Sequence, residues 1–129
     1  YESVWTDLPG YGYAKTSKKR RSMLSEQIRD YFMKSDALCG VIWLLDIRHP
    51  YNKNDVMALE WLNTLKLPVL PVFTKCDKLR KRDLSGNLSK YMEMFNERPM
   101  YALVSVNQPE KKREFFRVFS KWRDLIAVS

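Results

Sequence analysis

Two short motifs in the sequence could bind a nucleotide, and each follows a segment that is predicted to be a strand. The first is the D-x-x-G turn Asp7-Leu8-Pro9-Gly10. Its carboxylate could hold a magnesium ion through water, and the N–H of Gly10 could approach a terminal phosphate oxygen closely. An Asx-type turn of the same sequence needs no ligand. The motif alone therefore leaves an ordinary turn open.

The second motif is Thr74-Lys75-Cys76-Asp77. The Asp77 carboxylate could accept hydrogen bonds from N1–H and the 2-amino group of guanine, whereas adenine offers neither donor there. Bidentate base contacts are worth ~1–3 kcal/mol each, and polar groups left unpaired reject the wrong base more strongly still. The stem of Lys75 could lie on the base. A surface loop is the alternative for T-K-x-D alone, but the two motifs in this order support a guanine nucleotide site.

Strand and helix patterns alternate along the chain. Strands are predicted at 3–6, 39–47, 68–74 and 101–105, and helices over 20–33, from about 54 to before 68, around 84–95 and around 115–126. Strands separated by helical segments of this length predict βαβ units and a parallel sheet, with ligands at the carboxyl ends of the strands. Pro71 is unusual in such a sheet, because a central strand needs every N–H.

Length and composition exclude several classes of protein. The 129 residues, 45% hydrophobic and 29% charged, fit a single soluble domain. The longest uncharged apolar run, 39–45, is far shorter than the ~18 residues of a membrane span, and no secretory segment opens the chain, so we expect no membrane contact and a cytoplasmic location. Two cysteines, Cys39 and Cys76, exclude a disulfide framework, and a single histidine excludes a His-rich zinc site.

The charge of the chain favours a polyanionic partner. Its formal net charge is +8 at pH 7 and its pI is about 9.6. Three basic clusters follow predicted strands: Lys15, Lys18, Lys19, Arg20 and Arg21; Lys75, Lys78, Arg80, Lys81 and Arg82; Lys111, Lys112 and Arg113. A charged run is usually a solvated face, but three at one sheet edge would converge where an RNA backbone could bind.

The first motif is part of a longer segment that resembles a known family. Asp7-Leu8-Pro9-Gly10-Tyr11-Gly12-Tyr13-Ala14-Lys15 is similar to the switch II segment of the EngB family of bacterial GTPases, which reads D-x-P-G-Y-G-Y-A. Further similar segments are Asp46-Ile47-Arg48-His49, Glu60-Trp61-Leu62, and Pro68-Val69-Leu70 before Thr74-Lys75-x-Asp77-Lys78-Leu79. The resemblance covers residues 1 to about 105. Beyond Ser105 it thins, and Val106 stands where the family usually has Ser or Ala.

The resemblance implies a Ras-like P-loop GTPase with a three-layer α/β fold and a mainly parallel sheet. Such a protein binds GTP and GDP with Mg²⁺, assists assembly of the large ribosomal subunit, and is linked to normal division and septation. Carried over by position, Asp7 is the magnesium-linked carboxylate and Gly10 the γ-phosphate sensor, with Leu8 and Pro9 between them. Thr74, Lys75, Cys76 and Asp77 form the guanine-reading loop, and Val104, Ser105 and Val106 the strand end whose N–H groups face the guanine carbonyl.

The phosphate loop of such a GTPase, G-x-x-x-x-G-K-[ST], does not occur in this sequence. Its glycines are Gly10, Gly12, Gly40 and Gly86, and no two are five apart. Switch I and the first two strands also have no counterpart. We therefore expect residues 1–129 to be a single partial GTPase domain, from the switch II strand to the C-terminal helix, of a longer protein.

Two alternatives follow for its activity. Tyr11 stands where Ras-type enzymes place a water-orienting glutamine, so no catalytic side chain is identified and hydrolysis is expected to be slow without a partner. We expect a monomer that contacts ribosomal RNA through Lys15, Lys18, Lys19, Arg20 and Arg21. The alternative is a nucleotide-free RNA-binding or scaffold protein on a degenerate GTPase fold.

Overall fold

The computed structural model describes residues 38–128, together with residues 26, 30 and 34. The chain divides into two compact units, 1–38 and 39–129, and the fold given below is that of the second unit. Glu26, Asp30 and Lys34 are helical and exposed, which fits the polar face of the helix predicted over 20–33.

Several predictions fall outside the described residues. They are the strand at 3–6, the motif Asp7-Leu8-Pro9-Gly10, and the basic cluster Lys15, Lys18, Lys19, Arg20 and Arg21.

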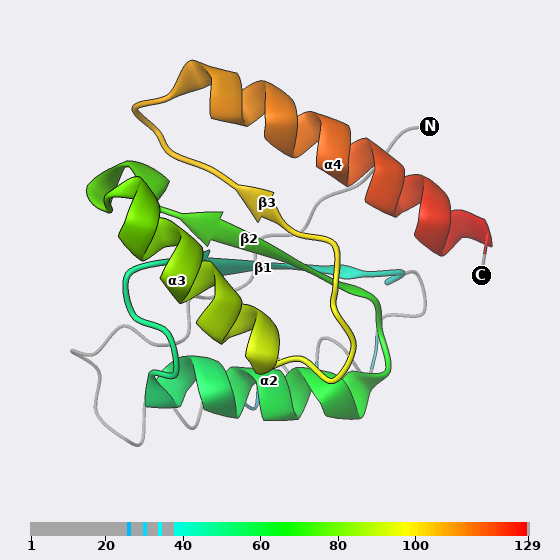
Figure 1. Cartoon of the computed structure of the whole chain (residues 1–129). Helices are drawn as coiled ribbons and strands as arrows, with labels where there is room; N and C mark the ends of the chain where they lie inside the picture. Colours follow the sequence, from blue (N-terminus) through cyan, green and yellow to red (C-terminus); the bar gives the residue numbers. More distant parts are fainter. Residues whose placement is uncertain (1–25, 27–29, 31–33, 35–37, 129) are drawn as a thin grey trace. The chain divides into compact units, whose positions relative to one another are not determined.

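The second unit alternates strands and helices as the sequence predicts. Its elements are β1 (Val41–Asp46), α2 (Lys53–Leu65), β2 (Val69–Thr74), the 3₁₀ helix η1 (Cys76–Lys78), α3 (Lys81–Glu93), β3 (Ala102–Leu103) and α4 (Pro109–Val128). The strands are parallel and lie in the order β1-β2-β3. Figure 1 shows this sheet with its strands ending at the same edge. The described part of the chain therefore confirms the predicted parallel α/β fold.

Pro71 lies in β2, the middle strand, without breaking the sheet. Every second residue of a parallel strand bonds to the same neighbouring strand, so Pro71 and Phe73 face the same side. The carbonyl of Phe73 accepts a hydrogen bond from the N–H of Val104 at 2.8 Å, on the β3 side. Pairing with β3 begins only at Ala102, opposite Val72. The missing N–H of the proline therefore falls just before the ladder starts.

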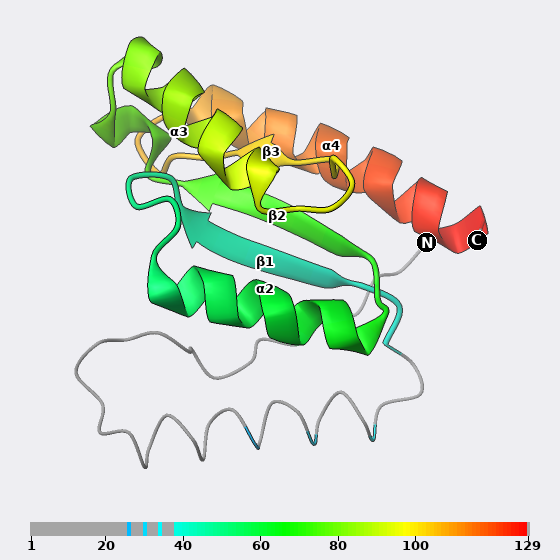
Figure 2. The same ribbon diagram turned by 60° about the horizontal axis from the view of Figure 1, so that its bottom comes forward.

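The helices cover the two faces of the sheet. Helices α2 and α3 lie on one face and α4 on the other (Figures 1 and 2). The first face buries Trp43, Leu45, Ile47, Leu59, Leu62, Phe73, Cys76 and Tyr91, and the second buries Leu70, Val72, Ala102 and Trp122. This arrangement makes three layers and sends the loops that follow β1, β2 and β3 to one edge. Over the described ranges, no helix is both long and apolar enough to cross a membrane.

Helix α2 has clear sequence signals at both ends. The Asn52 side chain accepts a hydrogen bond from the N–H of Asp55 at 2.9 Å, which satisfies one of the free N–H groups of the first turn. The helix ends at Lys66, whose backbone is left-handed, two residues before Pro68.

Candidate functional site

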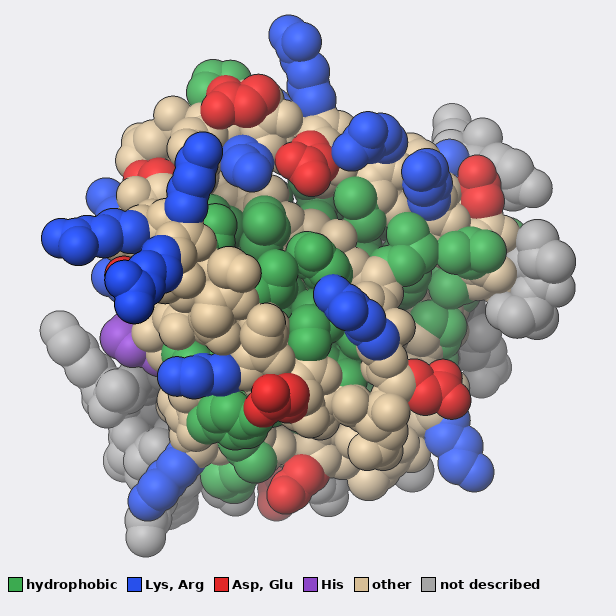
Figure 3. All heavy atoms as spheres, viewed as in Figure 1, with side chains coloured by type: hydrophobic (Ala, Val, Ile, Leu, Met, Phe, Trp, Pro, Cys, Tyr) green, Lys and Arg blue, Asp and Glu red, His purple; other side chains and the backbone are tan. Residues whose placement is uncertain are grey.

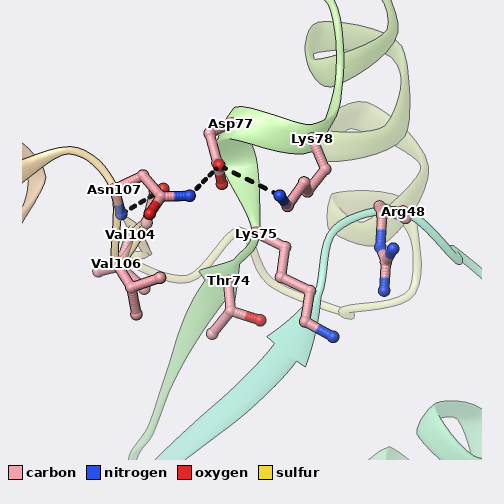
Figure 4. Close-up of a pocket in the computed structure, with 9 residues that line it drawn as sticks. Arg48, Thr74, Lys75, Asp77, Lys78, Val104, Val106 and Asn107 are labelled. Carbon is pink, nitrogen blue, oxygen red and sulfur yellow. Dashed lines mark hydrogen bonds and ion pairs between the residues drawn. The ribbon is translucent and has the colours of Figure 1, made fainter.

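A cavity of about 490 Å³ lies at the carboxyl ends of the strands. Its lining residues come from the loops after all three strands: Arg48, Thr74, Lys75, Asp77, Lys78, Val104, Ser105, Val106 and Asn107 (Figure 4). The T-K-x-D loop and the end of β3, which are about thirty residues apart in sequence, thus form two walls of one cavity. This is the juxtaposition that the sequence predicts.

The backbone after β2 turns sharply to form the first wall. Lys75 adopts the left-handed conformation, with φ 62° and ψ 31°, which is unfavourable for a residue with a side chain. The turn sends Cys76 into the core, where its side chain is 4% exposed, and leaves Asp77 facing the cavity. The hydroxyl of Thr74 donates to the carbonyl of Leu45 at 3.2 Å, so this side chain also ties the loop to β1.

The Asp77 carboxylate is held in place within the cavity. The side-chain amide of Asn107 donates to its Oδ2 at 2.8 Å, and the ammonium group of Lys78 lies 3.8 Å from the same oxygen (Figure 4). Hydrogen bonds from Asn107 and Ser105 lower the pKa of Asp77 below its ordinary value. The side chain is 17% exposed. Asp77 is therefore a fixed, ionised hydrogen-bond acceptor, as recognition of two adjacent N–H donors requires.

The two walls are joined by backbone hydrogen bonds as well. The N–H of Cys76 donates to the carbonyl of Val104 at 3.4 Å, in addition to the bond from Val104 to Phe73. Burial raises the pKa of the Cys76 thiol, and the thiol itself donates to the carbonyl of Phe73 at 3.3 Å. The side chain of Cys76 therefore belongs to the core, and its backbone helps to hold the walls together.

The third side of the cavity carries a charged cluster of Asp46, Arg48 and Lys75. The Arg48 guanidinium donates to both carboxylate oxygens of Asp46, at 3.0 and 2.7 Å, and the Lys75 ammonium lies 3.4 Å from Oδ2. Burial alone would raise the pKa of Asp46, but the hydrogen bonds from Arg48 and Lys75 outweigh it and hold that pKa well below its ordinary value. The Lys75 side chain, which is 52% exposed, therefore extends toward the Asp46–Arg48 pair.

Tyr91 of α3 supports the loop after β1 from the core side. Its ring is fully buried, and its hydroxyl lies 2.7 Å from the carbonyl of Asp46, 2.9 Å from that of His49 and 3.1 Å from Oδ2 of Asp55. Burial raises the pKa of Asp55, while hydrogen bonds from Asn52 and Tyr91 act in the opposite direction. One hydroxyl therefore links α3, the end of β1 and the start of α2.

Exposed cations surround the cavity. Several Lys and Arg side chains gather at the left of the view in Figure 3, where η1 and α3 begin in Figure 1. The exposed members of this basic rim are Lys78, Arg80, Lys81, Arg82, Lys112 and Arg113. Most lie near the starts of α3 and α4, where the helix macrodipole disfavours positive charge. Helix stability thus does not explain their position.

Most of the predicted site residues that the structure describes line the cavity, but not all of them do. Thr74, Lys75, Asp77, Val104, Ser105 and Val106 line the cavity, whereas Cys76 lies in the core. Asp7, Leu8, Pro9 and Gly10 lie outside the described residues. Asn107 was not predicted from the sequence; the available signal was an amide two residues after Ser105, the end of the predicted strand. Within the described ranges, no group of three or more His, Cys, Asp or Glu side chains could hold a metal ion.

Comparisons with known proteins agree on one family. No protein-family model matches the chain. A "Probable GTP-binding protein EngB" of Ruthia magnifica is 39% identical over 100 residues, which cover 78% of this chain and 49% of that protein. A protein of the same name from Hydrogenovibrio crunogenus is 35% identical over 115 residues, covering 89% and 54%.

One solved structure has a similar fold. It is described as the crystal structure of a probable GTP-binding protein engB, and it matches with a TM-score of 0.67 over 96% of this chain and 83% of that one. At 17% identity this likeness concerns the fold alone. The chain spans about half the length of the curated relatives it matches. Over that span, the sequence similarity and the fold together place the chain in the EngB family of GTP-binding proteins.

Proposed function

We propose that this chain is the base-recognising part of a GTP-binding protein, and that guanine occupies the cavity between the two walls. The observation that carries the proposal is the Asp77 carboxylate, which faces the cavity as a fixed, ionised acceptor. Asp77 accepts hydrogen bonds from N1–H and the 2-amino group of guanine. The Lys75 stem lies along one face of the base, and N–H groups of the segment from Val104 to Val106 face the guanine carbonyl.

The phosphate end of the nucleotide lies outside this cavity. We propose that Asp7 holds Mg²⁺ through water and that Gly10 meets the γ-phosphate, as the resemblance implies. The metal would supply charge neutralisation on the phosphates. GTP hydrolysis by the complete protein, slow without a partner, is part of this proposal. So is the assignment of residues 1–129 to one partial GTPase domain.

The proposal also covers the cellular role. The protein acts as a monomer in the cytoplasm, assists assembly of the large ribosomal subunit and supports normal division and septation. Ribosomal RNA is met by the cluster Lys15, Lys18, Lys19, Arg20 and Arg21 together with the basic rim. The net charge of +8 and the cations near the starts of α3 and α4 support an RNA partner.

Exchange of Asp77 for Asn tests the base-recognition proposal. In the full-length protein, Asp77→Asn should lower GDP affinity by about 30- to 100-fold, because the amide cannot accept both guanine donors. Xanthosine diphosphate, whose C2 carbonyl can accept from the new amide, should bind better to the variant than to the wild type. Asp83→Asn is the matched control, since Asp83 is an exposed Asp six residues on, in the first turn of α3. An unchanged base preference would defeat the assignment.

The salt dependence of ribosome binding tests the RNA proposal. Replacement of Lys81, Arg82, Lys112 and Arg113 by Gln should reduce the slope of log affinity against log salt for purified bacterial large subunits by about 2 to 3. The control replaces the exposed residues Lys66, Lys90, Arg98 and Lys121 by Gln. Its slope should fall by less than that of the basic-rim variant. Equal slopes for the two variants would show that the basic rim does not contact RNA.

The same experiments distinguish the alternative, a nucleotide-free RNA-binding protein. If this alternative holds, the full-length protein would bind large subunits with a steep salt dependence but would show no affinity for GDP or GTP.

A further inference from the structure

We infer that Asn107 is a positioning residue for base recognition, whose side-chain amide fixes the Asp77 carboxylate in the orientation that reads guanine. The inference rests on the proposed function, because it concerns the same cavity. It adds a residue that neither the motifs nor the comparisons assign to the site.

The geometry of Asn107 suits this role. It lies between β3 and α4, thirty residues after Asp77, and its amide nitrogen is 2.8 Å from Oδ2 of Asp77 (Figure 4). Its own backbone N–H donates to the hydroxyl of Ser105 at 3.2 Å, and the N–H of Gln108 donates to the carbonyl of Ser105 at 3.2 Å. These two bonds hold the backbone at Asn107 in place, and from there its exposed side-chain amide reaches the carboxylate.

The amide leaves the carboxylate free to bind a base. Each carboxylate oxygen has two lone-pair directions, so the donors from Asn107 and Ser105 still leave acceptor sites for the base. What the bond removes is rotation about the Cβ–Cγ axis of Asp77. Two parallel N–H donors on a rigid ring can both be accepted only when the plane of the carboxylate matches the plane of the base. The orientation set by Asn107 therefore matters most for the second contact, to the 2-amino group.

A neutral donor is also the suitable kind of group. A cation in direct contact with Oδ2 would neutralise the carboxylate and weaken its attraction for the base donors. The nearby ammonium of Lys78 lies at 3.8 Å and is 55% exposed, which makes it a weak and poorly directed partner. The Asn107 amide instead orients Asp77 and keeps its negative charge available.

Nucleotide binding by Asn107 variants of the full-length protein tests the inference. Asn107→Ala and Asn107→Leu, the second of similar volume, should lower GDP affinity by about five- to tenfold, which corresponds to the net contribution of one ordinary hydrogen bond. Inosine diphosphate, which lacks the 2-amino group, should lose only about twofold, so the preference for guanine over hypoxanthine falls. Gln108→Ala, which removes a neighbouring amide whose side chain does not line the cavity, should leave both affinities near wild type.

A double-mutant cycle separates positioning from a general effect on the loop. If Asn107 acts through Asp77, Asn107→Ala should change GDP affinity by less than about twofold in an Asp77→Ala background. The melting temperature of each variant, measured alongside, shows whether the fold is kept.

The outcomes of these measurements show whether the positioning role alone fails or the proposed function fails with it. Unchanged or increased GDP affinity in both Asn107 variants, or an equal loss for inosine diphosphate, overturns the positioning role while the proposed function stands. A wild-type protein that binds neither GDP nor GTP overturns the proposed function and this inference together.

Discussion

Replacement of Tyr91 by Phe tests how the loop after β1 is supported. The Tyr91 ring is fully buried, and its hydroxyl contacts two backbone carbonyls and one carboxylate, on three separate segments. Tyr91→Phe removes one oxygen atom and keeps the ring, which packs on Phe73 with centroids 5.1 Å apart. The change therefore isolates the hydrogen bonds from the packing.

The loss of stability expected for Tyr91→Phe depends on which of the three acceptors around the hydroxyl keep another hydrogen-bond donor. The carbonyl of His49 also accepts from the Asn52 amide at 2.7 Å, and Asp55 accepts from the same amide, so both retain a partner. Once the Tyr91 hydroxyl is removed, the carbonyl of Asp46 keeps only the backbone N–H of His49, at 3.5 Å. A buried acceptor left with so long a bond loses much of the about 1–3 kcal/mol that a fully unpaired one costs. We expect the free energy of unfolding to fall by about 1.5 kcal/mol.

The loss should depend on pH, with a sign that can be derived. Burial raises the pKa of Asp55 above its ordinary 3.8, and the bond from Tyr91 partly opposes this rise. A carboxyl with a raised pKa in the folded protein stabilises the fold at low pH, and that contribution is lost as pH rises through the folded pKa. Tyr91→Phe raises the pKa of Asp55 further. The variant should therefore be more destabilised at pH 7 than at pH 4.

Urea unfolding followed by tryptophan fluorescence measures both effects. With a slope of about 1.5 kcal/mol per molar urea, the midpoint should fall by about 1 M. Tyr101→Phe is the control, because its ring also contacts Phe73 but its hydroxyl makes no hydrogen bond in the described part of the chain. Equal losses in the two variants, or a Tyr91→Phe loss below about 0.5 kcal/mol, would refute the role given to the Tyr91 hydroxyl.

Two further predictions concern stability. A Cβ at Gly40 would lie 2.5 Å from the ring of Trp122, so Gly40→Ala should lower the free energy of unfolding by about 1–3 kcal/mol. A Cβ at Gly86, inside α3, would meet nothing within 4 Å, so Gly86→Ala should raise the free energy of unfolding by about 0.5–1 kcal/mol. Urea midpoints measure both changes. The pKa of Asp46 is lowered by Arg48, so its carboxylate stabilises the fold above pH 3.8 and less as pH falls below it; Asp46→Asn should lose less stability than wild type on acidification, as acid titration of fluorescence would show.

The sheet could be predicted because its strands carry strong local signals. The apolar run from Cys39 to Ile47, broken only by Asp46, predicts a buried strand over 39–47, and the structure has β1 at Val41–Asp46. The strand predicted at 101–105 is shorter in the structure, where β3 is Ala102–Leu103. The reason is tertiary: the carbonyl of Val104 is turned toward the N–H of Cys76. No local pattern in the sequence encodes that bond.

Helix ends were less predictable than helix faces. The buried face of α4 is predicted at Phe115, Phe116, Phe119, Trp122 and Ile126, and all of these pack into the core except Phe116, which is 50% exposed. The helix begins six residues before Phe115, at Pro109. A proline at the first helical position is a known start signal, since its missing N–H needs no partner there. The start of α4 was therefore available in the sequence, and it matters because Asn107 lies just before it.

The site divides in the same way. Asp77 was predictable because T-K-x-D is a continuous motif at a strand end, and its chemistry depends on residue types alone. Asn107 was not, because its contact with Asp77 spans thirty residues and exists only when two loops meet. The Asp46–Arg48 pair was partly predictable, because its residues are two apart in the sequence. Its contact with Lys75 forms only when β1 and β2 pair in the sheet.

Asp46 and Asn107 hold the two base-contacting side chains of the proposed site from opposite sides of the cavity. The Asp46 side chain directs Lys75, and its carbonyl accepts from Tyr91, so the support of Lys75 continues into the core through β1. The support of Asp77 comes instead from the segment before α4, where Asn107 and Ser105 donate to its carboxylate. Tyr91→Phe removes the bond to the Asp46 carbonyl, so it should disturb stacking on the base by Lys75 and lower affinity for all purine nucleotides alike. Loss of the Asn107 amide should change the choice among purines.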